Sequence, residues 1–167
     1  MNSFSKLIMV TVVFVAAMLP AGAQQDEWIP LCSKCLTPSI SSKSGIGTAH
    51  AVAEGKVTFK DAQQWCASWE PDNQGCPNEQ LDSEKGAVYR ISANCPAGRL
   101  TSFDGAVYTH TREVWDASDI GQGLPKFRDA KGKIVGRDNA SNGLGLAAQW
   151  DVLCPARKPD RRGASSR

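Results

Sequence analysis

Residues 87–110 read AVYRISANCPAGRLTSFDGAVYTH, and this stretch predicts the start of an antiparallel β-sheet. Residues 87–94 alternate apolar and polar side chains, which is typical of a strand with one buried face. Residues 99–110 place β-rich arms on both sides of Asp104-Gly105, a pair that favours a two-residue hairpin turn. The sequence therefore predicts a strand followed by a hairpin.

Further strands are expected toward the C-terminus. FRDAKGKIVGRD, residues 127–138, predicts two strands joined by a turn at residues 130–132. AAQWDVLC, residues 147–154, predicts a last strand. About six short strands in this region indicate a small antiparallel sheet or an SH3-like barrel.

The clearest predicted helix covers residues 58–71, TFKDAQQWCASWEP. Thr58 is a suitable N-cap, and Asp61 places negative charge near the N-terminus of the helix. Trp65 and Trp69 lie on its apolar stripe, together with other apolar residues at helical spacing. We expect this stripe to form core rather than a platform for a ligand.

The rest of the N-terminal half gives weaker patterns. Residues 36–47 are rich in serine, glycine and proline and are expected to form a loop. Residues 48–57 are compatible with either a short helix or a strand. Residues 76–86 predict a second short helix, because Pro77 fits its first position and Gly86 fits its end.

The first 23 residues have the features of a secretory signal peptide. Lys6 precedes an uncharged, largely apolar run at residues 7–19, and the small residues that follow suit cleavage after Ala23. The run is shorter than the ~20 residues that cross a bilayer, so no stable membrane anchor is expected after cleavage. We predict a secreted or periplasmic protein.

The charge distribution excludes a typical nucleic-acid-binding protein. The chain has a net charge of +2, and its last twelve residues, 156–167, contain five basic residues and one acid. The body of the protein is therefore mildly acidic, with no basic stripe interleaved with aromatic residues. The basic tail has almost no apolar residues and is expected to be disordered.

The cysteine count predicts disulfide bonds. Six cysteines follow the predicted cleavage site, and an even number in an oxidising compartment favours three disulfides. Cys95 and Cys154 both precede a proline at the end of a predicted strand. We expect these two to pair and to tie the end of the β region to its beginning.

Two arrangements remain for the other four cysteines. We expect crossed pairing of Cys32 and Cys35 with Cys66 and Cys76, with Cys32–Cys35 plus Cys66–Cys76 as the alternative. A zinc site would need a second close pair of ligands, which the sequence lacks. A redox dithiol would need a helix after Cys32 to lower the thiol pKa, and a loop is predicted there. Structural disulfides are therefore favoured over metal or redox chemistry, and no cofactor is expected.

Residues 108–123, YTHTREVWDASDIGQG, form the densest cluster of polar and aromatic side chains. A loop carried by a rigid sheet is a common place for binding residues. The candidate ligand-binding residues are Tyr108, His110, Arg112, Trp115, Asp116 and Asp119. Asp116 and Asp119 could form an acid/base pair with His110 as a general base, but no G-x-S-x-G motif is present.

These patterns predict an α+β protein with four regions. The signal peptide covers residues 1–23, a disulfide-tied loop and helical region residues 24–86, a small β domain residues 87–155, and the disordered tail residues 156–167. The short helices are expected to pack on the sheet or barrel.

The function expected from these patterns is non-catalytic binding. Its partner would be an envelope polymer or another exported protein, and inhibition is one form of such binding. The first alternative is a small cell-wall hydrolase that uses Asp116, Asp119 or His110. The second is thiol redox chemistry through Cys32 and Cys35.

Overall fold

A computed structural model describes residues 27–32, 34–115, 123–135 and 140–155, with only the backbone described for residues 140–142. The predicted signal peptide and basic tail lie outside these ranges. Three helices and six strands are described. In chain order they are β1 (Ser39–Ser44), β2 (Ala51–Lys56), α1 (Phe59–Trp69), α2 (Cys76–Ser83), β3 (Tyr89–Asn94), β4 (Arg99–Thr101), β5 (Val107–Val114), β6 (Pro125–Arg128) and α3 (Ala140–Leu153).

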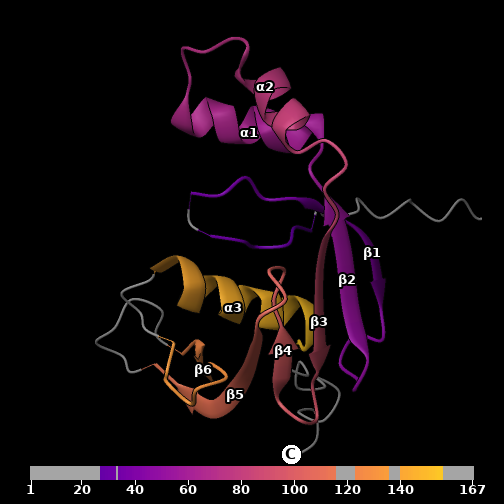
Figure 1. The fold of residues 1–167 in the computed structure, drawn as a ribbon, viewed down its shortest axis with the longest axis vertical. Helices are drawn as coiled ribbons and strands as arrows, with labels where there is room; N and C mark the ends of the chain where they lie inside the picture. Colours follow the sequence, from indigo (N-terminus) through magenta and orange to yellow (C-terminus); the bar gives the residue numbers. More distant parts are fainter. Residues whose placement is uncertain (1–26, 33, 116–122, 136–139, 156–167) are drawn as a thin grey trace, which may run out of the picture.

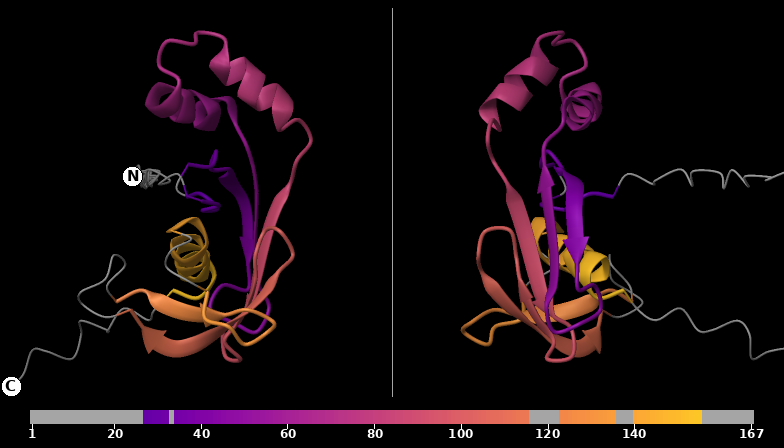
Figure 2. Two further views of the ribbon diagram at one scale, coloured as in Figure 1. Left: turned by 60° about the vertical axis from the view of Figure 1, so that its left-hand side comes forward. Right: turned by 90° about the vertical axis from the view of Figure 1, so that its right-hand side faces the viewer.

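The strands form one open antiparallel sheet in the order β1-β2-β3-β4-β5-β6. The α+β class is therefore confirmed, but the SH3-like barrel is wrong, because β1 and β6 are the two edges of the sheet. Helix α3 lies in the curve of the sheet and contacts β2, β3 and β6 (Figure 2). It covers the apolar inner face of the sheet, which would be buried inside the barrel if the sheet were closed.

Helix α3 corrects the prediction of a last strand at residues 147–154. Leu146, Gln149 and Leu153 are buried at helical spacing. The neighbouring residues are largely apolar as well, so the short run contained no decisive period. A glycine is required at position 145, since a Cβ there would lie 2.9 Å from the carbonyl oxygen of Leu31.

The serine-rich segment predicted as a loop contains β1. Its side chains are mostly exposed, so it lacks the alternating apolar pattern of a half-buried strand. The ambiguous segment that follows is strand β2, in which Ala51, Ala53 and Gly55 face the core. Serine-rich, polar composition is common on edge strands, which are exposed to solvent.

Helices α1 and α2 confirm the two helical predictions. Thr58 caps α1 in a capping box, in which Asp61 N–H donates to Thr58 Oγ1 at 3.2 Å and Thr58 N–H donates to Asp61 Oδ2 at 2.8 Å. Pro77 lies in the first turn of α2. The two helices form an insertion between β2 and β3, and Figure 1 shows them beyond one end of the sheet, with residues 27–32 and 34–38 between them and α3.

The hairpin of β4 and β5 is confirmed, with one more residue in its turn than expected. Ser102 N–H donates to the carbonyl oxygen of Ala106 at 2.9 Å, so the turn consists of residues 103–105. Gly105 has a φ of +81°, which favours glycine. Within the described residues, only the first arm of the second predicted hairpin is a strand, β6. The second arm contributes a single bridge, between Arg128 and Ile134.

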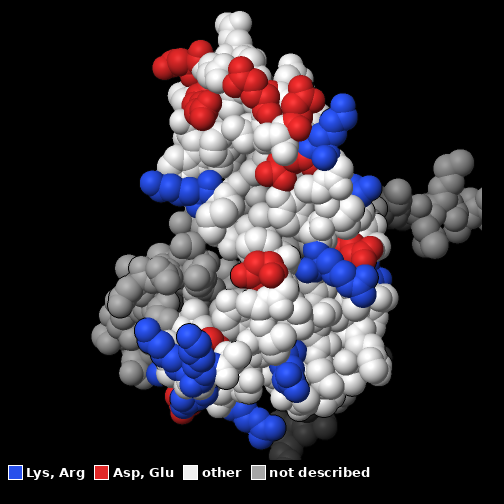
Figure 3. All heavy atoms as spheres, viewed as in Figure 1, with Lys and Arg blue, Asp and Glu red and all other residues white. Residues whose placement is uncertain are grey.

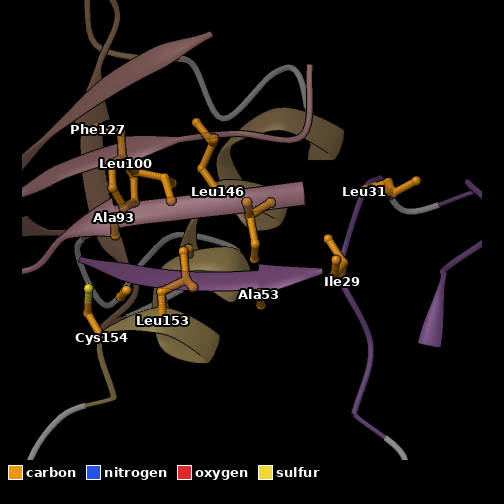
Figure 4. Packing of buried hydrophobic residues seen from close by; sticks show 12 residues of the cluster. Ile29, Leu31, Ala53, Ala93, Leu100, Phe127, Leu146, Leu153 and Cys154 are labelled. Carbon is orange, nitrogen blue, oxygen red and sulfur yellow. The ribbon is translucent and has the colours of Figure 1, made fainter. Parts of the chain in front are cut away.

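The core lies between the inner face of the sheet and α3 (Figure 4). Ile29 from the N-terminal segment and Ala53 from β2 are in the same cluster as Phe127 and Leu153. Residues from both sides of the proposed boundary at residue 86 therefore share one core. The buried side-chain amide of Gln149 forms hydrogen bonds with Ser102 and Pro30 in this region.

Three disulfides are present. They are the turn disulfide Cys32–Cys35, the helical-hairpin disulfide Cys66–Cys76 and the sheet–helix disulfide Cys95–Cys154. The sheet–helix disulfide is the pairing expected from sequence. The crossed pairing expected for the other four cysteines is wrong and its alternative is present, because Cys66 and Cys76 are buried facing each other between α1 and α2.

Candidate ligand-binding site

The structure distributes the candidate residues of 108–123 over different environments. Tyr108 and His110 are half-buried on β5, on the face that packs against α3, whereas Arg112 is exposed. Trp115 is half-buried just beyond the strand. The remaining two candidates, aspartates 116 and 119, lie outside the described residues. The four described candidates therefore lie in different environments and do not form one cluster of side chains.

His110 is engaged in packing. Its ring stacks on Trp150 of α3 with 5.0 Å between centroids, and Phe127 contacts it edge-on at 5.5 Å. Its Nδ1 accepts a hydrogen bond of 3.0 Å from the backbone N–H of Arg112, whose φ is +65°. Burial lowers the pKa of His110, and the nearby Arg112 charge lowers it further. This histidine is therefore neutral near pH 7.

Trp115 is also held by its neighbours. The ammonium group of Lys126 lies 5.0 Å from the centroid of the Trp115 ring, and it also lies 4.0 Å from the carboxylate of Glu113. The backbone N–H of Trp115 donates to the carbonyl oxygen of Leu124 at 3.0 Å. These contacts close the end of the β5–β6 pair, which is a structural role.

Among the described residues, the clearest candidate site is a pocket of about 300 Å³ between the turn disulfide and α1, which we call the tryptophan pocket. It combines three indole rings with a disulfide and a few polar groups. Its lining residues are Trp28, Cys32, Cys35, Thr37, Asp61, Gln64, Trp65 and Trp69. None of these residues was among the ligand-binding candidates chosen from the sequence.

The expectation that Trp65 and Trp69 belong to the core is wrong. Trp69 is 47% exposed, Trp65 is only half-buried, and Phe59 on the same helix is 45% exposed. The physical reason is the position of α1, which lies beyond the sheet and buries only three residues. Trp28, from the segment that precedes the turn disulfide, is 40% exposed and adds a third ring.

Two contacts fix the wall of the tryptophan pocket. The indole N–H of Trp65 donates to the carbonyl oxygen of Lys34 at 2.9 Å. The ammonium group of Lys34 lies 5.2 Å from the centroid of the Trp69 ring. Lys34 lies within the loop that the turn disulfide closes, so the disulfide and α1 support each other.

The carboxylate of Asp61 is used for structure. It is 4% exposed and accepts hydrogen bonds from the backbone N–H and the hydroxyl groups of Thr58 and Ser39. These bonds join β1 to the start of α1. By contrast, the side-chain amide of Gln64 is exposed and forms no hydrogen bond with the described residues.

A second hollow, of about 450 Å³, lies over the outer face of β2–β5. It is lined by polar side chains and by Arg90 and Arg99. Arg90 is paired with Glu54 at 2.6 Å. No Trp, Tyr or Phe ring lines this hollow, so it lacks the aromatic contact surface of the tryptophan pocket.

Among the described residues, no group of three potential ligands could hold a metal ion. The helices within the described ranges are also too short or too polar to cross a membrane. Comparison with known proteins finds no match to a family model, a curated protein or a solved structure. Three disulfides in an α+β protein of this size are typical of an oxidising, extracytoplasmic compartment.

Proposed function

We propose that this chain is an exported binding protein that holds its ligand in the tryptophan pocket. The observation that carries the proposal is the exposure of Trp28 and Trp69 around one pocket of a small protein. Large apolar side chains that gather on a surface usually mark a binding site, and tryptophan is enriched in such sites. The predicted signal peptide and the disulfides support export.

The lining of the tryptophan pocket favours binding over catalysis. Asp61 is its one carboxylate, and both oxygen atoms of Asp61 already accept hydrogen bonds from the protein. Cys32 and Cys35 are bonded to each other, which leaves no thiolate nucleophile. The hydrolase hypothesis gains no support from the described residues, because His110 is stacked between β5 and α3.

The partner we propose is a component of the cell envelope, either a polymer or another exported protein. An experiment with matched variants tests this. The immobilised protein is incubated with the extracytoplasmic fraction of its host, and bound material is identified. Trp69→Ala removes a pocket ring, whereas Phe59→Ala removes a similarly exposed ring of α1 that does not line the pocket.

We expect wild type and Phe59→Ala to retain the same component and Trp69→Ala to lose it. Circular dichroism confirms that both variants remain folded. Equal retention by all three proteins, or no retention by any of them, would refute the proposal.

Thiol redox chemistry remains a second candidate, because the turn disulfide lines an open pocket while Cys66 and Cys76 are buried. Its weakness is that no helix starts at Cys32 to stabilise a thiolate. In the reaction, an external dithiol would reduce Cys32–Cys35 and itself become a disulfide. Catalysed reduction of insulin by dithiothreitol is the test, and a rate equal to the uncatalysed rate removes this candidate.

A further inference from the structure

We infer that the ligand of the tryptophan pocket is a neutral saccharide, one ring of which stacks on Trp69 while Gln64 binds its hydroxyl groups. This inference rests on the proposed function and names the class of ligand for the same site. Four properties of the pocket lead to it: its size, its mixed lining, its charge and its rigidity.

The size suits one ring of a chain. A volume of about 300 Å³ is at the lower end for small-molecule sites, so it accepts a single ring rather than a folded partner. The pocket is open toward solvent, because Trp28 and Trp69 are 40% and 47% exposed. An open pocket lets the neighbouring units of a polymer continue over the surface on both sides.

The lining matches the two faces of a sugar ring. A pyranose with equatorial hydroxyl groups has an apolar face of axial C–H bonds and a polar edge. The ammonium group of Lys34 lies 5.2 Å from the centroid of the Trp69 ring, a contact that reflects the electron-rich character of the ring. Sugar C–H bonds are polarised in the same sense, although more weakly.

Polar groups of the pocket would meet the polar edge of the ring. The Gln64 amide, which has no hydrogen-bond partner among the described residues, offers both a donor and an acceptor. The Thr37 hydroxyl donates to the carbonyl oxygen of Cys35 at 3.3 Å and can still accept a hydrogen bond. A purely apolar guest would remove water from these groups without replacing its hydrogen bonds, which costs free energy.

The charge around the pocket disfavours an anionic ligand. Residues 57–86, which contain α1 and α2, carry six acidic and two basic residues. Figure 3 shows acidic side chains gathered over this part of the molecule. The resulting negative potential disfavours an anionic polymer at the pocket. The ammonium group of Lys34, which lies over the Trp69 ring beside the pocket, repels a cationic ligand.

The rigidity of the pocket lowers the entropy cost of binding. Trp65 is fixed by its hydrogen bond to Lys34, and the turn that carries Lys34 is closed by Cys32–Cys35. A preorganised site loses little freedom when a ligand binds. This matters for saccharides, because each hydrogen bond they gain replaces one with water.

The test is titration of the purified mature protein with two β-1,4-linked neutral saccharides, cellotetraose and the fully N-acetylated chitotetraose. Binding is followed by tryptophan fluorescence and by calorimetry. Sorbitol is the control ligand, because it has the hydroxyl groups but no ring. We expect at least one tetrasaccharide to bind and sorbitol to have no effect.

The variants separate the pocket from the rest of α1. Trp69→Ala should weaken saccharide binding at least about tenfold, Gln64→Ala should weaken it less, and Phe59→Ala should leave it unchanged. Binding that is equal in wild type and Trp69→Ala overturns the inference. So does the absence of binding by both tetrasaccharides at about 10 mM, a concentration well above a millimolar Kd.

The outcomes also separate this inference from the proposed function. If both tetrasaccharides fail but Trp69-dependent retention of an envelope component persists, the saccharide inference falls and the proposed function stands. If that retention is absent as well, both fall.

Discussion

The indole N–H of Trp65 donates a hydrogen bond of 2.9 Å to the carbonyl oxygen of Lys34, across a sequence separation of 31 residues. This bond joins α1 to the turn that Cys32 and Cys35 close. The Lys34 side chain then reaches the Trp69 ring, one helical turn further along α1. The shape of the tryptophan pocket therefore depends on a contact that is distant in sequence.

Replacing Trp65 by phenylalanine tests this dependence. The Trp65→Phe variant keeps an aromatic ring but loses the hydrogen bond to Lys34. We therefore expect its free energy of unfolding, measured by urea denaturation, to be about 1 kcal/mol lower than that of the wild type. Ligand binding should weaken as well, because the turn is no longer fixed. The matched control is Trp115→Phe, since the indole N–H of Trp115 makes no hydrogen bond with the described residues. Equal effects of the two substitutions would contradict the role of this bond.

The local parts of the fold could be predicted from the sequence. Thr58 and Asp61 form a capping box within four residues, and Gly105 fits its turn through its own backbone conformation. Whether an apolar stripe of a helix is buried depends on distant parts of the chain. The stripe with Trp65 and Trp69 is buried only if another element covers it, and the sequence does not reveal that α1 lies beyond the sheet.

Helix α3 and the tryptophan pocket were missed for related reasons. Residues 140–153 combine glycines with an apolar run that has no single polar face, so neither a helical nor a strand period stood out. Trp28 stands close to Cys32 in the sequence, which in retrospect is the available signal of an aromatic site at the turn disulfide. Its proximity to α1 depends on the tertiary structure.

The turn disulfide should be the first of the three to be reduced. Cys32 and Cys35 are half-buried and line an open pocket, so a small dithiol reaches them more easily than the buried Cys66 and Cys76. Brief treatment of the native protein with dithiothreitol, followed by alkylation and mass spectrometry, measures the order. First labelling of either other disulfide would refute the expectation.

The turn disulfide should also contribute less to the stability of the protein than the sheet–helix disulfide. The turn disulfide closes a loop with a sequence separation of 3, so in the chain-entropy model its removal costs only about 2 kcal/mol. The sheet–helix disulfide has a separation of 59 and should contribute about 4 kcal/mol. Denaturant unfolding of the two double Cys→Ser variants measures both costs. The expectation is wrong if the variant that lacks Cys32–Cys35 is the less stable one.

The packing of His110 predicts a pH dependence of stability. Burial lowers the folded-state pKa of His110 from its ordinary value of 6.5, so the unfolded chain binds a proton more readily than the folded protein. The stabilisation is therefore complete above about pH 6.5 and is lost as the pH falls through the folded-state pKa. Protonation also removes the Nδ1 acceptor that Arg112 N–H uses.

The measurement compares the free energy of unfolding of wild type and His110→Phe between pH 7.5 and pH 5, by urea denaturation. Phenylalanine keeps a ring against Trp150 but does not titrate. Subtracting the two curves cancels groups common to both proteins, such as Asp151, whose pKa is raised by burial. The difference between the curves should shrink or change sign as the pH falls. Parallel curves would show that His110 does not titrate in this range. The control variant is His50→Gln, which replaces an exposed histidine.

The amide of Gln149 is a buried polar group of the core whose loss should lower stability. It is 1% exposed, its Nε2 donates to the carbonyl oxygen of Pro30 at 2.7 Å, and its Oε1 accepts from the hydroxyl of Ser102 at 2.9 Å. Gln149→Leu keeps much of the volume but leaves both partners unsatisfied, so stability should fall by about 1–3 kcal/mol. The double variant Gln149→Leu/Ser102→Ala removes one of the orphaned groups and should recover part of that loss. If the loss of stability in the double variant instead equals the sum of the two single losses, the two side chains do not act as a pair. The link between the β4–β5 turn and α3 must then depend on apolar contacts alone.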